Sequence, residues 1–96
     1  MEINNYSINA IIYSTLFLDF RYVSEEIKKE RLKDFGLHLA KKRKELGYTQ
    51  EELAHQSGLT LSQIARIETG VINTTINTVF IIADTLKVPA KNLFEY

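Results

Sequence analysis

Residues 48–70, YTQEELAHQSGLTLSQIARIETG, alternate polar and apolar positions in the pattern of two short helices joined by a tight turn. Thr49 followed by Glu52 fits a capping box, in which a hydroxyl and a later side chain satisfy free amides at a helix start. Thr60 followed by Gln63 repeats the pattern eleven residues later. The pattern predicts helix starts at both threonines.

The residues around these caps support the same interpretation. Tyr48 and Leu59 precede the caps, where a hydrophobic staple is expected. Gly58 and Gly70 stand where a helix end takes a left-handed residue, and Ala54 and Gly58 are small enough for the two helices to approach closely. Two helices with so short a connection form a helix-turn-helix, whose second helix enters the DNA major groove.

Three further helices are predicted around this pair. Residues 32–46 have helical spacing and end at Gly47, with Leu32, Phe35, Leu39 and Leu46 facing one way. Residues 76–86 follow a cap at Thr75 and have a core stripe made of Ile76, Val79, Ala83 and Leu86. Phe80, Ile81 and Ile82 widen that stripe, which indicates that something covers this helix.

Pro89 is placed to start a last short helix at Ala90, with Leu93 and Phe94 turned inward. The expected fold is therefore all-α, with five helices and an N-terminal appendage.

The appendage, residues 1–29, precedes the domain expected at residues 30–96. Its apolar-rich run at 6–23 is too short and too interrupted to span a bilayer and lacks the features of a signal peptide. Helical spacing connects Ile8, Ile12, Tyr13, Leu16 and Phe20, but the β-branched and aromatic content fits a strand almost as well. The segment either packs on its own domain or serves as a dimerisation arm.

Composition limits the chemistry. The chain of 96 residues contains no cysteine, which excludes disulfides and thiolate metal sites and is consistent with a cytoplasmic protein. His38 and His55 each stand alone, as surface or boundary residues without a metal partner. No nucleophile–base pair or phosphate-cradling glycine loop is present, so neither enzyme activity nor a cofactor is expected. The net charge of zero still permits a local DNA-binding face.

Residues 35–94 resemble the phage-repressor, or Cro-like/Xre, family of helix-turn-helix proteins. The resemblance rests on TQEELA, a glycine at the turn, Ile-x-x-Ile-Glu-x-Gly and Ala-x-x-Leu-x-Val at fixed spacing. It implies that the second helix of the motif reads base edges. The positions concerned are Thr60, Leu61, Ser62, Gln63 and Arg66. Arg66 can bond guanine and Leu61 can touch a thymine methyl, whereas capping competes for Gln63.

The resemblance also implies phosphate contacts and a structural ion pair. Gln50 and Lys42 are candidate phosphate ligands, and the start of the fourth helix offers amides and hydroxyls that can hold an anion. The residues at that start are Asn73, Thr74, Thr75 and Thr78. Residues 41–44, KKRK, form the one basic run of the chain, which is either a solvated face or a phosphate contact. Arg43 and Glu68 would form an ion pair, which takes one charge away from that run.

The expected function is sequence-specific binding of double-stranded DNA by a homodimeric transcriptional regulator on a palindromic operator, with no membrane involved. Two alternatives remain open at this point. One is an antitoxin that binds a toxin protein and represses its own promoter. The other is a protein-interaction module that has lost DNA binding.

Overall fold

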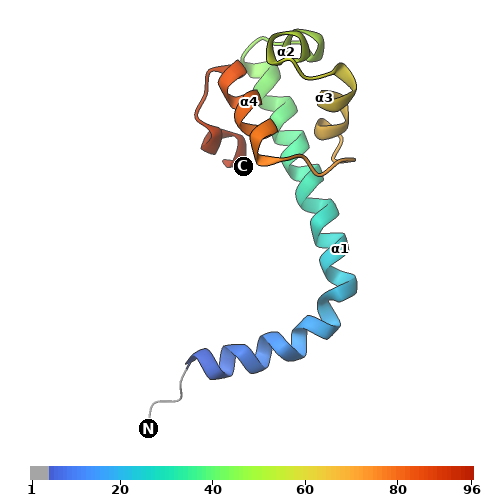
Figure 1. Cartoon of the computed structure of the whole chain (residues 1–96), viewed down its shortest axis with the longest axis vertical. Coiled ribbons are helices and arrows are strands. Elements are labelled where there is room, and N and C mark those ends of the chain that lie inside the picture. Colours follow the sequence, from blue (N-terminus) through green and yellow to red (C-terminus); the bar gives the residue numbers. More distant parts are fainter. Residues whose placement is uncertain (1–4) are drawn as a thin grey trace.

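The computed structural model describes the backbone of residues 5–96 and the side chains of residues 25–96 (Figure 1). It contains four α-helices and one 3-10 helix, and no strand within the described range. The elements are α1 (Asn5–Glu45), α2 (Gln50–Ser57), α3 (Leu61–Glu68), α4 (Ile76–Leu86) and η1 (Ala90–Phe94). The predicted all-α fold is confirmed, and the short fifth helix after Pro89 is of the 3-10 type.

The N-terminal appendage continues α1, so the helical alternative holds and the strand does not. The helix runs from Asn5 to Glu45 through the charged stretch that follows Ser24. In Figure 1 its C-terminal part lies among the other helices and its N-terminal part leads away from them. The apolar side chains from Ile8 to Phe20 lie outside the described residues. Within the described range, no helix is both long enough and apolar enough to cross a membrane.

The core lies where the five elements meet. Each element contributes one fully buried large side chain, and these are Leu39, Leu53, Ile64, Ile82 and Leu93. Val79, Ala83 and Leu86 of the predicted α4 stripe are also buried. One buried anchor per element joins short helices that would be marginal in isolation.

Three residues predicted to face the core are exposed instead. Leu46 follows the last residue of α1 and therefore does not continue the core-facing side of that helix. Ile76 is the first residue of α4 and is 73% exposed, because the helix turns its first side chain away from the core. Phe94 ends the 3-10 helix and is 57% exposed, although the centroid of its ring lies 5.1 Å from that of the Phe35 ring.

His38 is buried, which corrects its prediction as a surface or boundary residue. Its Nε2 lies 2.8 Å from the carbonyl oxygen of Asn92, and its ring lies 4.9 Å from that of Tyr96. The carbonyl can only accept, so the imidazole donates from Nε2. This bond connects α1 to η1, and the role of His38 is structural.

Glycine sets the closest approach between α1 and α3. A Cβ on Gly36 would overlap the carbonyl oxygens of Ile67 and Glu68. Gly58, predicted to allow close packing of α2 and α3, has no neighbour within 4 Å of such an atom; its φ of 75° is what calls for glycine. The signal for Gly36 is weak in the sequence, because a mid-helix glycine does not reveal its neighbour.

Candidate nucleic-acid interface

Helix α3 begins with a complete capping box, as predicted. The Thr60 hydroxyl accepts a hydrogen bond from the backbone N–H of Gln63 at 3.0 Å. Gln63 Oε1 accepts one from the backbone N–H of Thr60 at 2.9 Å. These bonds fix the first turn of α3. They occupy the carbonyl oxygen of the Gln63 side chain and leave its NH₂ group to donate elsewhere.

Helix α2 has only half of its predicted box. Thr49 Oγ1 accepts from the Glu52 amide at 3.0 Å, which satisfies the N-cap. The Glu52 carboxylate is bonded by the Thr49 hydroxyl at 3.1 Å and has no bond to the Thr49 amide. The capping prediction for Thr49 is confirmed, but the reciprocal bond from Glu52 is absent.

A buried ion pair connects the ends of α1 and α3. Arg43 Nε and Nη2 donate to the two carboxylate oxygens of Glu68 at 2.6 and 3.0 Å, and Arg43 Nη1 donates to the Tyr48 carbonyl at 2.7 Å. Both charged side chains are almost fully buried. This bidentate ion pair and the bond to Tyr48 fix the last turn of α3 relative to α1 and to the loop before α2.

Gln50 belongs to the same network. Its Nε2 donates to Glu68 Oε1 at 2.9 Å, so one of its two amide protons is used inside the protein. The second proton remains available for an external acceptor. Gln50 is half-buried at the first position of α2, beside the outer face of α3.

The predicted base-reading residues form an exposed row on α3. Leu61, Ser62 and Gln63 occupy its first turn, and Arg66 follows one turn later. All four side chains are exposed, as is that of Thr60. Within residues 25–96, Arg66 has no ion pair, so its guanidinium can meet an outside partner.

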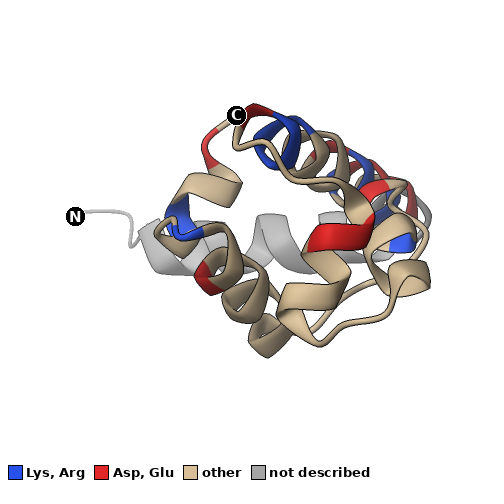
Figure 2. Ribbon diagram, turned by 90° about the horizontal axis from the view of Figure 1, so that it is seen from above, with Lys and Arg blue, Asp and Glu red and all other residues tan. Residues whose placement is uncertain are grey.

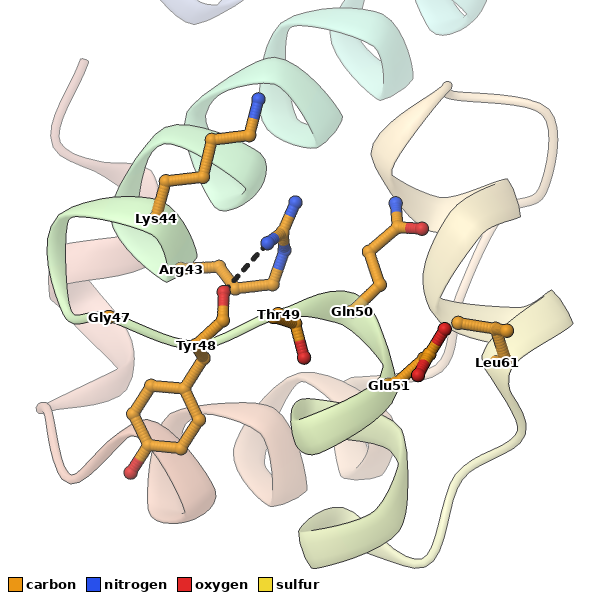
Figure 3. A pocket seen from close by; sticks show the side chains of 8 residues that line it. All are labelled: Arg43, Lys44, Gly47, Tyr48, Thr49, Gln50, Glu51 and Leu61. Carbon is orange, nitrogen blue, oxygen red and sulfur yellow. Dashed lines mark hydrogen bonds between the residues drawn. The ribbon is translucent and has the colours of Figure 1, made fainter.

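A hollow of about 680 Å³ lies beside this row (Figure 3). Its lining brings Gln50 together with Leu61, with Lys44 of the basic run at 41–44, and with Glu51, which the sequence did not single out. Lys44 extends from the end of α1, and the Glu51 carboxylate lies at the start of α2 (Figure 3). The sequence position of Glu51 could have suggested it, since Glu51 adjoins Gln50.

The other candidate phosphate ligands do not gather in this hollow. Lys42 Nζ lies 3.6 Å from Glu45 Oε2, and Lys42 does not line the hollow. Thr75 caps α4 by accepting from the Thr78 amide at 3.2 Å, and the two hydroxyls lie 3.0 Å apart. The remaining two candidates, Asn73 and Thr74, border a separate apolar groove between α1 and α4.

Positive charge is sparse around the motif. From Tyr48 to Val79 the chain has Arg66 as its one lysine or arginine, against Glu51, Glu52 and the paired Glu68. In Figure 2 the basic residues concentrate on α1, and much of the remaining ribbon is uncharged. Any long-range attraction to a polyanion therefore comes mainly from α1.

Comparison with known proteins agrees with this geometry. The helix-turn-helix family model matches residues 39–93, which include α2, α3 and α4. The chain belongs to the helix-turn-helix family, in its Xre/Cro-like branch.

A solved structure extends the match. The crystal structure of the restriction-modification controller protein C.AhdI from Aeromonas hydrophila has a TM-score of 0.66 and 32% sequence identity to this helix-turn-helix protein. The match covers 68% of this chain and 98% of that one. No curated protein sequence matches the chain. Membership places this protein among DNA-binding transcription regulators rather than in an enzyme family.

Proposed function

We propose that this protein is a homodimeric transcription regulator that reads a palindromic operator with α3. Each subunit would occupy one half-site, and the half-site centres would lie about one helical turn, roughly 34–36 Å, apart. Occupancy of the operator near a promoter would then change transcription.

The observation that carries the proposal is the contrast within α3. Its inner residues, Ile64, Ile67 and Glu68, are buried, whereas its outer row is exposed and its first turn is capped. A helix held this firmly can present side chains to base edges without losing much conformational freedom on binding.

The exposed row suggests a division of roles. Arg66 has the donor fork that pairs with guanine O6 and N7, and Leu61 offers an apolar contact for a thymine methyl. Ser62 is small enough for a base or a phosphate. The Gln63 NH₂ group can donate to a base acceptor, but its carbonyl oxygen is already used by the cap.

Phosphate contacts would flank the row. The second amide proton of Gln50 and the ammonium of Lys44 border the hollow beside Leu61 and can donate to backbone oxygens. Lys42, Asn73, Thr74, Thr75 and Thr78 remain candidates at the edges. Glu51 opposes phosphate at the same place, so we expect modest affinity for random DNA and a larger share of the binding energy from base contacts.

Selection of bound sites from random duplex DNA by the purified protein tests this function. The expected result is an enriched inverted repeat with one-turn spacing between half-sites. Arg66→Ala should lose the preference at one base pair of each half-site. Failure to enrich any sequence, at low as well as physiological salt, would contradict the proposal.

The sparse positive charge favours one rival, an interaction module of the same family that no longer binds DNA. That rival predicts no enrichment, and no binding even at low salt, where contacts to phosphates are strongest.

A further inference from the structure

We propose that the apolar groove between α1 and α4 receives the N-terminal arm, residues 6–23, of a second copy of this chain. The two copies would exchange arms around a two-fold axis. The inference rests on the homodimer of the proposed function and names the surfaces that form it.

The groove is open and mostly apolar, with a volume of about 480 Å³. Leu32 and Phe35 of α1 form one wall, and Ile76 and Val79 of α4 form the other. Phe94 and Tyr96 border it at the C-terminal end, and both are exposed. Phe80 is half exposed one turn beyond Ile76 and extends the apolar surface along α4.

So large a concentration of uncovered apolar side chains is unusual on a soluble monomer and is typical of a surface that binds a partner. Ile76 is 73% exposed and Tyr96 is 65% exposed, although both are large. Water contact at these residues would be removed by an apolar segment lying in the groove.

The arm has the matching chemistry. Residues 6–23, YSINAIIYSTLFLDFRYV, contain one acidic and one basic residue and are otherwise dominated by aliphatic and aromatic types. A helix with apolar residues on most of its circumference requires cover from other protein surfaces. Residues 69–86 carry even less charge over the same length, but they include α4, which already forms one wall of the groove.

The arm of the same copy is badly placed to fill the groove. α1 is one helix from Asn5 to Glu45, so the arm leads away from Leu32, which is itself in α1. Counted along the helix at 1.5 Å per residue, positions 12–20 lie roughly 18–30 Å beyond that wall of the groove. A second copy can supply the same segment without any break in α1, which favours exchange between copies.

The groove also adjoins the proposed DNA contacts. Asn73 and Thr74, which are candidate phosphate ligands, form part of its border next to Ile76. An arm seated there would pack against this loop, so the dimer contact would lie directly beside the proposed phosphate contacts.

Cross-linking between two single-cysteine variants tests the exchange, because the natural chain contains no cysteine. Ile76→Cys supplies the groove thiol, and Ile12→Cys, Leu16→Cys or Phe20→Cys supplies the arm thiol. Each arm variant is mixed with the groove variant, the subunits are allowed to exchange, and a short flexible bismaleimide is added. Leu37→Cys replaces the groove variant as the control, since Leu37 is 68% exposed on α1 but does not line the groove.

At least one arm position should give a covalent dimer with Ile76→Cys and little with Leu37→Cys. Absence of that product at all three positions would overturn the inference, as would equal products with both partners. Sedimentation of the natural chain distinguishes a failure of the arm exchange from a failure of the homodimer. A dimer without arm cross-links refutes the arm exchange alone, whereas a monomer at all concentrations also refutes the proposed homodimer.

A second measurement uses charge in place of cysteine. Ile76→Glu should raise the dimer dissociation constant at least about tenfold, because a large apolar contact is replaced by a charge that loses water. Leu37→Glu should leave it unchanged. Circular dichroism of both variants checks that the helical body, in which these two positions are exposed, remains folded.

Discussion

On the face formed by α2 and α3, polar groups are bonded to one another, whereas the groove between α1 and α4 leaves large apolar side chains uncovered. The first face has a complete capping box, a buried ion pair and Gln50 bonded to that pair. The groove has Ile76, Phe94 and Tyr96 open to solvent. The proposed reading face is therefore held in place by its own bonds before any contact with DNA, whereas the groove offers an apolar surface that a second copy would cover on our proposal.

The largest expected effect comes from breaking the ion pair that holds the reading face. Arg43→Ala should lower the free energy of unfolding by about 3–5 kcal/mol, because Glu68 would remain buried without its partner. The double variant Arg43→Met/Glu68→Leu should recover much of that loss. Urea titration measures both, and equal losses in the single and double variants would show that the charge pairing is not what matters.

The next largest effect is expected from a substitution at Gly36, where α1 and α3 approach most closely. Gly36→Ala should destabilise the fold by roughly 1–3 kcal/mol or more, since the new methyl meets backbone carbonyls that cannot move independently. Gly47→Ala is the matched control. It meets no atom within 4 Å but has a φ of 83°, so its cost should be about 1 kcal/mol. Thermal unfolding that ranks Gly47→Ala above Gly36→Ala would contradict this account of the packing.

Gln50 serves both the buried network around Glu68 and the proposed contact with DNA. Gln50→Ala should cost roughly 1.5–3 kcal/mol of stability at most, the range for a hydrogen bond to a charged group. It should also weaken binding to all DNA sequences alike. Gln50→Glu would bring a carboxylate beside Glu68 and phosphate, and anisotropy titrations should show a larger loss. Sequence-dependent weakening by Gln50→Ala would instead indicate base contact.

Substitution of Glu51 should have the smallest effect, and it should strengthen DNA binding rather than weaken it. Glu51→Gln should tighten DNA binding by up to about fivefold at low salt, because one like charge about 4 Å from a phosphate costs about 1 kcal/mol in water. The gain should fade as salt screens the repulsion. Glu95→Gln, near the C-terminus and outside the hollow, should leave affinity unchanged. Weaker binding by Glu51→Gln would assign this carboxylate an attractive contact, such as one to a cytosine amino group.

Much of the helix-turn-helix could be predicted because its signals are local. Thr60 and Gln63 are three residues apart, and the left-handed glycines lie within two residues of the helix ends. The ion pair of Arg43 with Glu68 was expected from family resemblance, because the partners are 25 positions apart and no local pattern connects them.

What could not be predicted depends on the packing of distant elements. His38 is buried because Asn92 and Tyr96 return to it from the C-terminus. Gly36 is required because the end of α3 passes directly over it. Ile76 and Phe94 fit an inward stripe by spacing, but each stands at the end of its element, where the periodicity no longer determines direction.

The proposed function depends above all on the exposed row of α3 reading DNA bases, and the binding of Arg66→Ala to selected operator duplexes checks this point. Anisotropy titrations would compare both proteins on the selected site and on duplexes with one base pair changed per half-site. Arg66→Ala should lose about 1–3 kcal/mol of binding free energy on the selected site and should stop discriminating at one base pair of each half-site. Unchanged affinity and an unchanged pattern of base preference would contradict it.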